Sequence, residues 1–522
     1  MQENIYKAQV TSAQVDISDP SSHQDILTAA KGGGILFVGQ IIEEGSTVVF
    51  AIMATRTLGA AGYGLYNMGI GVALILATVA MLGLPEGMMR FLPIGLGEHN
   101  AVKMRSTLFI GIGLSLIIGL SIGIIFFSLG EVLATNLFHE PSAAFVIRLF
   151  SIIIPLEAVG RVLLGAALGL KRGDYQVYSY SIGFSLVRLG FTALFLFIGL
   201  DVAGVVMAYS LAWFVTIGLL IKLINQVVPL NHQKHIKRGD IQKLVSFSTP
   251  LCLNEITLQF RGYVDILLMG VIGTMMASVG VYSAATRVQS SGNMLLAPIA
   301  NIAKPLISDL NHQSETARLK RLYQTLTRWS LSFMLPLVAT IILYPKPILS
   351  IFGDEFVIGV PVLILVGLGM LINAATRICH SMISMTGHST MTFITTLLSL
   401  ILNVIFDILL IPQWGMVGAA VSTVLAIVIV GLVRLLQIYF LVGLWPYNRT
   451  IAKPLIATLI ALLAGLLANH FFSANSSLFF FVLDAFILWS IYIVATVLLG
   501  LSEEDHAVLS RVGSRLKNIL YR

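Results

Sequence analysis

The chain has 522 residues, of which 57% are hydrophobic and 11% are charged, and its mean hydropathy is +0.90. A soluble domain carries about 25% charged residues, so this composition excludes a soluble globular protein and indicates a membrane protein. The net charge is +7. No G-x-x-x-x-G-K-[ST] motif occurs, which excludes an ATP-binding loop within the chain.

Fourteen apolar stretches lie between residues 32 and 500. Each is about 20 residues long, which is the length of a helix that crosses the hydrocarbon core of a bilayer. The polar segment Met1–Ala30 precedes them without the basic start and apolar core of a signal peptide, so we expect a mobile tail there. The predicted spans are 32–55, 63–84, 107–129, 143–170, 176–199, 202–224, 243–271, 280–303, 328–345, 358–384, 390–411, 415–442, 451–472 and 478–500.

The loops alternate in charge along the chain. Lys and Arg concentrate after the second, fourth, sixth, eighth and twelfth spans, whereas the intervening loops carry mainly acids. Cytoplasmic loops are enriched in Lys and Arg, so both termini and the Lys234–Lys243 loop are expected in the cytoplasm. The basic loops hold Arg90, Lys103, Arg105, Lys171, Arg172, Lys222, Lys234, Lys237, Arg238, Lys243, Lys304, Arg318, Lys320, Arg321, Arg328, Arg449 and Lys453.

The two halves of the chain resemble each other. Arg161 and Arg188 are 27 residues apart in the first half, and Arg377 and Asn403 are 26 residues apart in the second. Six spans match the next six in the same order, which predicts a parallel repeat of the kind that some transporters build around an axis along the membrane normal. In such proteins the substrate binds between the halves.

A weaker match pairs Gly59–Tyr66, after the first span, with Gly273–Tyr282, after the seventh. The predicted fold is therefore an all-α polytopic membrane protein with 14 transmembrane helices, arranged as two six-helix bundles in a parallel pseudo-twofold repeat plus two extra C-terminal helices. The expected divisions are 1–30 (polar cytoplasmic tail), 31–230 (first bundle), 240–445 (second bundle), 446–500 (last two helices) and 501–522 (cytoplasmic tail).

Several spans carry charged or amide side chains at mid-length. Glu157 and Arg161 are four residues apart, as are Asn373 and Arg377, so each pair shares one face of its helix. Charge at the centre of a bilayer is costly, and such groups usually line a cavity or meet a partner. The predicted substrate-binding residues are Arg161, Arg188, Arg377, Glu157, Asn373, Asn403, Arg261 and Asp265.

Two interpretations of these arginines are open. A pair such as Arg161 with Glu157 can neutralise itself and do no more than hold helices together. Arg161, Arg188 and Arg377 taken together have too few acids on their own faces, which favours an anionic ligand. The planar guanidinium group binds pairs of phosphate oxygens, so we predict that the three arginines converge on one cavity and hold a phosphate or diphosphate.

Three acids are candidate sites for a coupling proton or sodium ion, namely Glu43, Glu44 and Glu255. Neighbouring helix positions point about 100° apart, so at most one of Glu43 and Glu44 need face a cavity. Cys252 and Cys379 both fall inside predicted spans and are interpreted as packing residues. No metal site, no cofactor and no nucleic-acid partner is predicted.

Several motifs, in their order along the chain, resemble the oligosaccharide (polysaccharide) flippase family of the multidrug/oligosaccharidyl-lipid/polysaccharide exporter superfamily. The resemblance covers nearly the whole chain apart from the tails. Each motif alone is weakly specific, because apolar helices are repetitive, and their order carries the match. The motifs are TLGAAGYGLY at 57–66, GLPEGMMRFLP at 83–93, GAALGLKR at 165–172, LNVIFDILLIP at 402–412 and GMVGAA at 415–420.

The resemblance implies two bundles around a V-shaped cavity that opens alternately to each face of the cell membrane. It implies a flippase, not an enzyme, for a polyprenyl-(pyro)phosphate-linked oligosaccharide, with membrane lipids and the glycosyltransferases or polymerase of the same pathway as partners. The alternatives are a lipid-linked peptidoglycan precursor flippase, an ion-coupled multidrug antiporter, and a membrane glycosyltransferase or ligase. Three central arginines argue against cationic drugs, and the short loops argue against the enzyme.

Overall fold

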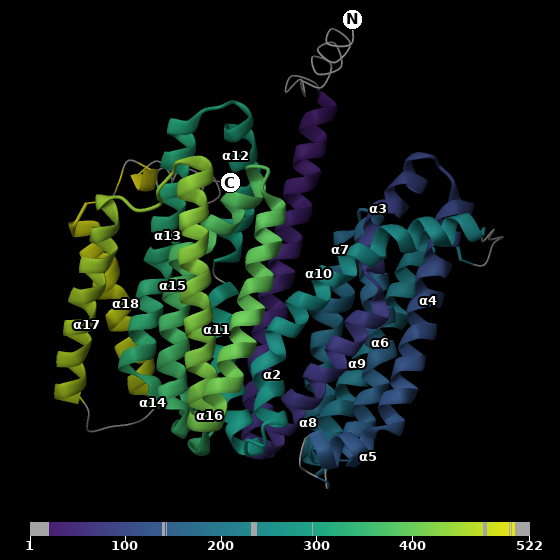
Figure 1. Ribbon diagram of the computed structural model, residues 1–522, viewed down its shortest axis with the longest axis horizontal. Coiled ribbons are helices and arrows are strands. Elements are labelled where there is room, and N and C mark those ends of the chain that lie inside the picture. The colour runs from purple at the N-terminus through teal and green to yellow at the C-terminus, as the bar shows by residue number, and fades with distance from the viewer. Residues whose placement is uncertain are drawn as a thin grey trace, which may run out of the picture.

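The computed structural model describes residues 20–137, 141, 144–230, 237–294, 296–472, 478–500, 502 and 504–506. Within these residues the chain is helical and contains no β-strand (Figure 1). Most of the expected N-terminal and C-terminal tails lies outside the described residues. The first described helix, α2, begins at Pro20, so the end of the expected N-terminal tail already belongs to a helix.

The first half of the chain forms helices that lie together on the right of Figure 1. Helix α2 runs between this group and the rest of the molecule. These elements are α2 (Pro20–Met81), α3 (Leu84–Gly97), α4 (Ala101–Ser128), α5 (Gly130–Val132), η1 (Leu133–Leu137), α6 (Ala144–Gly169), α7 (Gly173–Gln176), η3 (Val177–Phe184), α8 (Ser185–Phe197) and α9 (Asp201–Val227).

The second half forms a second group on the left of Figure 1, with α17 and α18 at its outer edge beside α13. Helix α10 packs against α2, α3 and α16 and so lies between the groups. These elements are α10 (Arg238–Val271), α11 (Met276–Met294), α12 (Ala297–His312), α13 (Thr316–Leu343), α14 (Pro345–Ser350), η4 (Asp354–Gly359), α15 (Val360–Met385), α16 (Ser389–Val442), η5 (Arg449–Ile451), α17 (Ala452–Phe472) and α18 (Leu478–Leu498).

Ten helices in the described part of the chain are long and apolar enough to cross a membrane. Two of them, at 34–97 and 390–442, have 64 and 53 residues, and each exceeds twice the roughly 20 residues that one crossing needs. Helices α10, α11 and α12 are absent from the ten, since α10 and α11 carry many polar side chains and α12 has only 16 residues. Large apolar side chains such as Phe197 (91% exposed) and Leu498 (81% exposed) cover the outside, as expected for a multi-pass membrane protein.

Two glycines bend the longest helices. Gly59 in α2 has φ 68° and Gly415 in α16 has φ 54°, a region of backbone space that favours glycine. The predicted spans 32–55 and 63–84 are therefore two helices that join at Gly59, and the spans 390–411 and 415–442 are two helices that join at Gly415. At Gly415 the chain turns back on itself, because a Cβ atom added at Gly418 would lie 2.3 Å from the carbonyl oxygen of Leu410, which precedes the turn.

The two groups of helices meet at one end of the molecule. A Cβ atom added at Gly64 of α2 would lie 2.0 Å from the carbonyl oxygen of Met276, and one added at Gly280 of α11 would lie 1.9 Å from that of Ala60. Arg56 Nε also donates to the carbonyl oxygen of Ile351 at 2.8 Å. Gly64 and Gly280, which the sequence matched as repeat equivalents, thus pack directly against each other.

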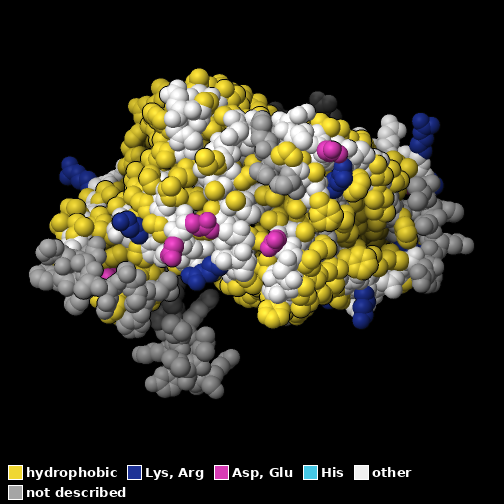
Figure 2. All heavy atoms as spheres, turned by 90° about the horizontal axis from the view of Figure 1, so that it is seen from below, with side chains coloured by type: hydrophobic (Ala, Val, Ile, Leu, Met, Phe, Trp, Pro, Cys, Tyr) yellow, Lys and Arg dark blue, Asp and Glu magenta, His cyan; other side chains and the backbone are white. Residues whose placement is uncertain are grey.

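The two ends of the molecule differ in charge. The described residues of the basic loops predicted from the sequence lie mainly at the upper end in Figure 1. We call it the basic end. Figure 2 looks onto the opposite end, where hydrophobic and uncharged polar side chains cover most of the face and charged side chains are scattered.

Candidate functional site

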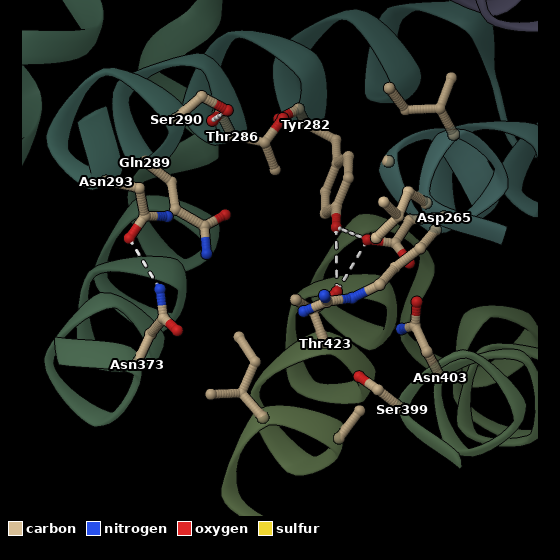
Figure 3. A pocket seen from close by; sticks show the side chains of 16 residues that line it. Asp265, Tyr282, Thr286, Gln289, Ser290, Asn293, Asn373, Ser399, Asn403 and Thr423 are labelled. Atoms are coloured by element: carbon tan, nitrogen blue, oxygen red, sulfur yellow. Dashed lines mark hydrogen bonds between the residues drawn. The ribbon is translucent and has the colours of Figure 1, made fainter. Parts of the chain in front are cut away.

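Four helices of the second group, α10, α11, α15 and α16, enclose a cavity of about 310 Å³, which we call the C-terminal cavity (Figure 3). Most side chains on its wall are polar, and few of them are charged. The polar lining residues are Arg261, Asp265, Tyr282, Thr286, Gln289, Ser290, Asn293, Asn373, Ser399, Asn403 and Thr423. Four predicted binding residues, Arg261, Asp265, Asn373 and Asn403, are thereby brought together.

Asp265 ties three helices to one another at this wall. The hydroxyl groups of Tyr282 on α11 and Thr423 on α16 both donate to its Oδ2, the latter at 2.7 Å (Figure 3). Its other oxygen, Oδ1, is buried and receives no hydrogen bond. One carboxylate oxygen of Asp265 is therefore available for a further partner.

Asp407, one turn beyond Asn403 on α16, lies close to Asp265. The side chain of Asp407 is fully buried, and neither of its carboxylate oxygens has a hydrogen-bond donor. Two adjacent buried carboxylates cannot both stay ionised without a proton or a cation between them. The geometry therefore suits the uptake of a proton or a small cation. The sequence analysis noted Asp265 as a binding residue and missed this pairing, because nothing in the sequence brings the two helices together.

A second group of side chains, the basic cluster, consists of Arg261, Lys304, Arg377 and Arg434, all close enough to His380 to interact with it electrostatically. Within the described part of the chain, no carboxylate forms an ion pair with any of these four cations. The buried Nε of Arg434 also lacks a hydrogen-bond partner. Asp265, one turn after Arg261 on α10, acts electrostatically on Arg261, whereas the other three cations have no paired carboxylate among the described residues. Lys304 and Arg434 were missed as site residues.

In the first group of helices, Glu157 and Arg161 form an ion pair. Their Oε1 and Nε atoms are 2.8 Å apart, and Glu157 is only 1% exposed. The Tyr209 hydroxyl donates to the other oxygen of Glu157 at 2.8 Å, and Arg161 donates to the Tyr180 hydroxyl at 3.1 Å. The charge of Arg161 is therefore largely balanced by its own helix, and the pair lines a second cavity.

This second cavity, which we call the N-terminal cavity, has a volume of about 320 Å³. Glu86, Glu157, Glu255 and Arg161 all line it, so acids outnumber bases on its wall. Glu255, a predicted coupling-ion site, is exposed there and accepts a hydrogen bond of 3.4 Å from Asn254. The two cavities thus differ in character, one acidic and the other mainly uncharged.

Arg188 is 8% exposed and lies between aromatic rings. Its Nη2 donates to the Thr47 hydroxyl at 3.0 Å, and its guanidinium carbon is 4.7 Å from the centre of the Phe50 ring. Arg161 and Arg188 both act electrostatically on Glu43, so these three residues form one group. Arg377 lies with the basic cluster in the other group of helices, and the predicted joint role of the three arginines stays a prediction.

The sequence analysis also overlooked Arg287 on α11. Its Nη2 lies 2.7 Å from Oε2 of Glu44 on α2, and both side chains are partly exposed. The pair bridges the two groups of helices. The sequence could not indicate this ion pair, because spacing along one helix predicts only partners within that helix and Glu44 lies on α2.

Cys252 and Cys379 are both buried and form no disulfide bond, which is consistent with their interpretation as packing residues. No group of three or more His, Cys, Asp or Glu side chains that could hold a metal ion lies in the described part of the chain.

The chain matches family models and known proteins over most of its length. Residues 29–311, more than half of the chain, match the model of the polysaccharide biosynthesis protein family, and residues 250–409 match that of the MatE family. The probable low-salt glycan biosynthesis flippase Agl15 of Haloferax volcanii is 22% identical over 396 residues, covering 75% of this chain and 79% of Agl15.

Solved structures share the fold. The lipid II flippase MurJ in an inward closed conformation superposes with a TM-score of 0.70 at 16% identity, over 90% of this chain and 98% of that structure. A multidrug resistance MATE family transporter of the MOP superfamily, in an inward-facing conformation, gives 0.64 at 14% identity over 76% and 94%. At these identities the likeness extends to the fold alone.

Proposed function

Because the chain belongs to the polysaccharide biosynthesis protein family, we propose that it is a flippase for a polyprenyl-(pyro)phosphate-linked oligosaccharide. It carries this substrate from the cytoplasmic to the outer leaflet of the cell membrane by alternating access. The glycan biosynthesis flippase among its relatives supports this substrate class. In this proposal the chain makes and breaks no covalent bond, and its partners are the glycosyltransferases that build the substrate and the polymerase or transferase that consumes it.

The basic cluster is the observation that carries the proposal. Arg377 and Arg434 lie in this cluster within predicted membrane spans, and neither has a paired carboxylate in the described part of the chain. Charge inside a bilayer is expensive unless a partner meets it. A diphosphate supplies several oxyanions, which the planar guanidinium groups of Arg377 and Arg434 bind in pairs. A multidrug antiporter that carries cations is disfavoured by the same cluster.

Arg161 and Arg188 have a different place in the proposal. Each already has a partner, Glu157 for Arg161 and the Thr47 hydroxyl with the Phe50 ring for Arg188. We propose that they meet the substrate after the bundles have moved, when it passes from the second group of helices to the first. Glu43, which both arginines influence, would take up their charge in the absence of substrate.

The proposed topology has fourteen crossings with both termini in the cytoplasm. Counting each of the two longest helical stretches as two crossings, and adding α10 and the α11–α12 pair, extends the ten apolar helices to fourteen. The concentration of Lys and Arg at the basic end supports a cytoplasmic assignment for it. In this proposal twelve of the crossings form two six-helix bundles, and α17 and α18 are additional.

Substrate movement is proposed to be coupled to a cation or to the membrane potential, since the chain has no ATP-binding loop. We propose the buried pair of Asp265 and Asp407 as the ion site. Neither carboxylate oxygen of Asp407 has a hydrogen-bond donor, and neither does Oδ1 of Asp265. Glu43, Glu44 and Glu255 remain proposed alternatives. One charge crossing the field gains about 2.3 kcal/mol per 100 mV, which is enough to bias the direction of transport.

The test uses the purified full chain in proteoliposomes with a fluorescent polyprenyl diphosphate-linked oligosaccharide. Translocation is followed by the fraction of substrate that an impermeant quencher reaches. Arg377→Ala should lower the initial rate about tenfold or more, as expected for the loss of a charged hydrogen bond. Arg377→Lys should restore only part of the rate, because a point charge replaces a planar fork.

Arg318→Ala is the matched control, since Arg318 lies on the surface in an ion pair with Glu315. It should transport like the unmodified protein. Full activity of Arg377→Ala would contradict the phosphate role. Equal transport of a lipid-linked peptidoglycan precursor would favour the alternative flippase, which shares the diphosphate chemistry.

A further inference from the structure

The C-terminal cavity has a wall whose chemistry differs from that of the basic cluster beside it. Apart from Arg261 and the Asp265 network, its polar lining consists of hydroxyl and carboxamide groups. Such groups both donate and accept hydrogen bonds and carry no charge. They match a ligand that is itself rich in hydroxyl groups, and they offer little to an anion.

One face of α11 provides four of the eleven polar residues on this wall. Tyr282, Thr286, Gln289 and Asn293 follow each other at spacings of four, three and four residues, which places them on one side of the helix. Figure 3 shows these side chains directed to the same space, with Asn373 facing them from the neighbouring helix. The row is therefore a continuous polar strip.

Several groups of this strip have unused hydrogen-bonding capacity. Asn293 Oδ1 accepts a hydrogen bond from Asn373 Nδ2 at 3.0 Å. The side-chain NH₂ group of Asn293 and the side-chain oxygen of Asn373 are not used in this hydrogen bond. The carboxamide of Gln289 and the hydroxyl of Ser399 have no hydrogen-bond partner among the described residues. Unmet carboxamides around a cavity are expected to bind a polar ligand or water.

The strip adjoins the basic cluster along α15. Asn373 lines the C-terminal cavity, and Arg377 stands four residues later on the same helix, which is one turn, or about 6 Å of rise. In a lipid-linked oligosaccharide the first sugar is bonded directly to the phosphate. A ligand with its diphosphate on Arg377 thus brings its first sugar to the wall that holds Asn373 and Gln289.

We propose that the C-terminal cavity is a sugar subsite that binds the first sugar of the lipid-linked glycan through Gln289, Asn293 and Asn373. The inference rests on the proposed flippase function and specifies the part of the substrate that this cavity recognises. A volume of about 310 Å³ is at the small end of ligand pockets, which suits one sugar ring and excludes a whole oligosaccharide. The more distant sugars would extend past the cavity without selection.

The test measures sugar preference. Proteoliposomes containing the full chain receive polyprenyl diphosphate carrying glucose, galactose or N-acetylglucosamine, and polyprenyl diphosphate without sugar. Gln289→Met and Asn373→Leu remove hydrogen-bonding groups at nearly constant volume. Each should reduce the preference between the best and the worst sugar about three- to tenfold, the loss expected for one uncharged hydrogen bond. Transport of the sugarless diphosphate should stay within about twofold.

Gln313→Met is the matched control, because Gln313 is exposed just after the end of α12, and it should keep the full preference. An unchanged preference in both cavity variants would overturn the inference. An equal loss with every substrate, the sugarless diphosphate included, would also overturn it, since the residues would then serve only the structure.

Calorimetric binding of soluble sugar 1-diphosphates to the purified protein separates this inference from the proposed function. If the unmodified protein binds these headgroups selectively and yet moves none of the lipids, the flippase proposal fails and the sugar subsite stands. If it moves all lipids at one rate and binds all headgroups equally, the flippase proposal stands and the subsite fails.

Discussion

Glu44 on α2 and Arg287 on α11 form an ion pair of 2.7 Å that joins the two groups of helices. Both residues lie inside predicted membrane spans, and their partial exposure means that neither charge is sealed in the protein. Because α2 and α11 must separate if the bundles open at this place, the pair stabilises the present arrangement. In the proposed alternating-access cycle, this ion pair has to break before the two groups of helices can separate here.

Removal of this ion pair should shift the bundles apart. Glu44→Gln or Arg287→Gln is expected to weaken the closed contact by about 1 kcal/mol, or about fivefold in population. The measurement is the distance distribution between spin labels on α2 and α11. The exchanged double variant, Glu44→Arg with Arg287→Glu, should recover most of the original distribution, and a swap no better than the single variants would refute the electrostatic explanation.

Neutralising one acid of the buried pair should abolish ion dependence. In Asp407→Asn the shared site loses a charge while its shape is kept, so the variant no longer needs a proton or cation for stability. Transport should become insensitive to a pH or sodium gradient, and the melting temperature without sodium should rise or stay constant. Asp240→Asn, a change at the exposed start of α10, serves as the control and should keep the ion response.

The close approach of α2 and α11 should tolerate no side chain. Gly64→Ala or Gly280→Ala places a methyl group within about 2 Å of a backbone oxygen, and overpacking of this kind typically costs about 1–3 kcal/mol. Both variants should increase labelling of cysteines introduced between the bundles at this end. Gly113→Ala has open space around its Cβ and should label like the unmodified protein.

The attachment of the C-terminal segment should depend on pH. Burial alone would raise the pKa of Asp505, but hydrogen bonds from Trp329 and Ser502, together with the Arg328 charge, hold the pKa below its usual range. A carboxylate whose pKa is lowered by folding stabilises the folded state above its unfolded pKa, and this stability is lost as the pH falls through the folded pKa. The segment should therefore detach below about pH 4.

A fluorophore on a cysteine at position 506 would report this detachment. Asp505→Asn should remove the acid transition and leave the segment loosely held at every pH. Glu504→Gln is the control because Glu504 lies farther from Arg328, at 3.7 Å, and is half exposed. It should preserve the transition, and a transition that survives in Asp505→Asn would assign the effect to another group.

Topology is tested by labelling intact cells with an impermeant thiol reagent. A cysteine at position 201 should react from outside, and a cysteine at position 237 should react only after the membrane is opened. The native cysteines Cys252 and Cys379 are both buried and form no disulfide bond, so we expect little background labelling from them. Labelling in the reverse pattern would invert the proposed orientation.

Hydropathy was sufficient for the helical membrane fold but not for where the helices end. The span 328–345 was predicted from its apolar residues, whereas α13 begins at Thr316, because the basic residues between 316 and 328 continue the helix beyond the apolar stretch. Length and hydrophobicity do not detect a polar extension, and they do not show that the two halves of α2 join directly at Gly59 without a loop.

Pairing within one helix could be predicted, and pairing between helices could not. The spacing of four residues correctly joined Glu157 to Arg161. The contacts of Asp265 with Thr423 and of Glu44 with Arg287 connect segments more than 150 residues apart in the chain, and only the packing of the helices brings them together. The same limit explains why the sequence analysis did not assign Arg434 to the site.

The bend at Gly415 has a mechanical consequence. Asp407 and Thr423 stand at equal distances along the chain before and after this glycine, so the helix before it carries one acid of the pair and the helix after it carries the hydroxyl that donates to Asp265. Because both helices contact the site of Asp265, a ligand that neutralises the acids is expected to hold them together, and its departure is expected to let them separate.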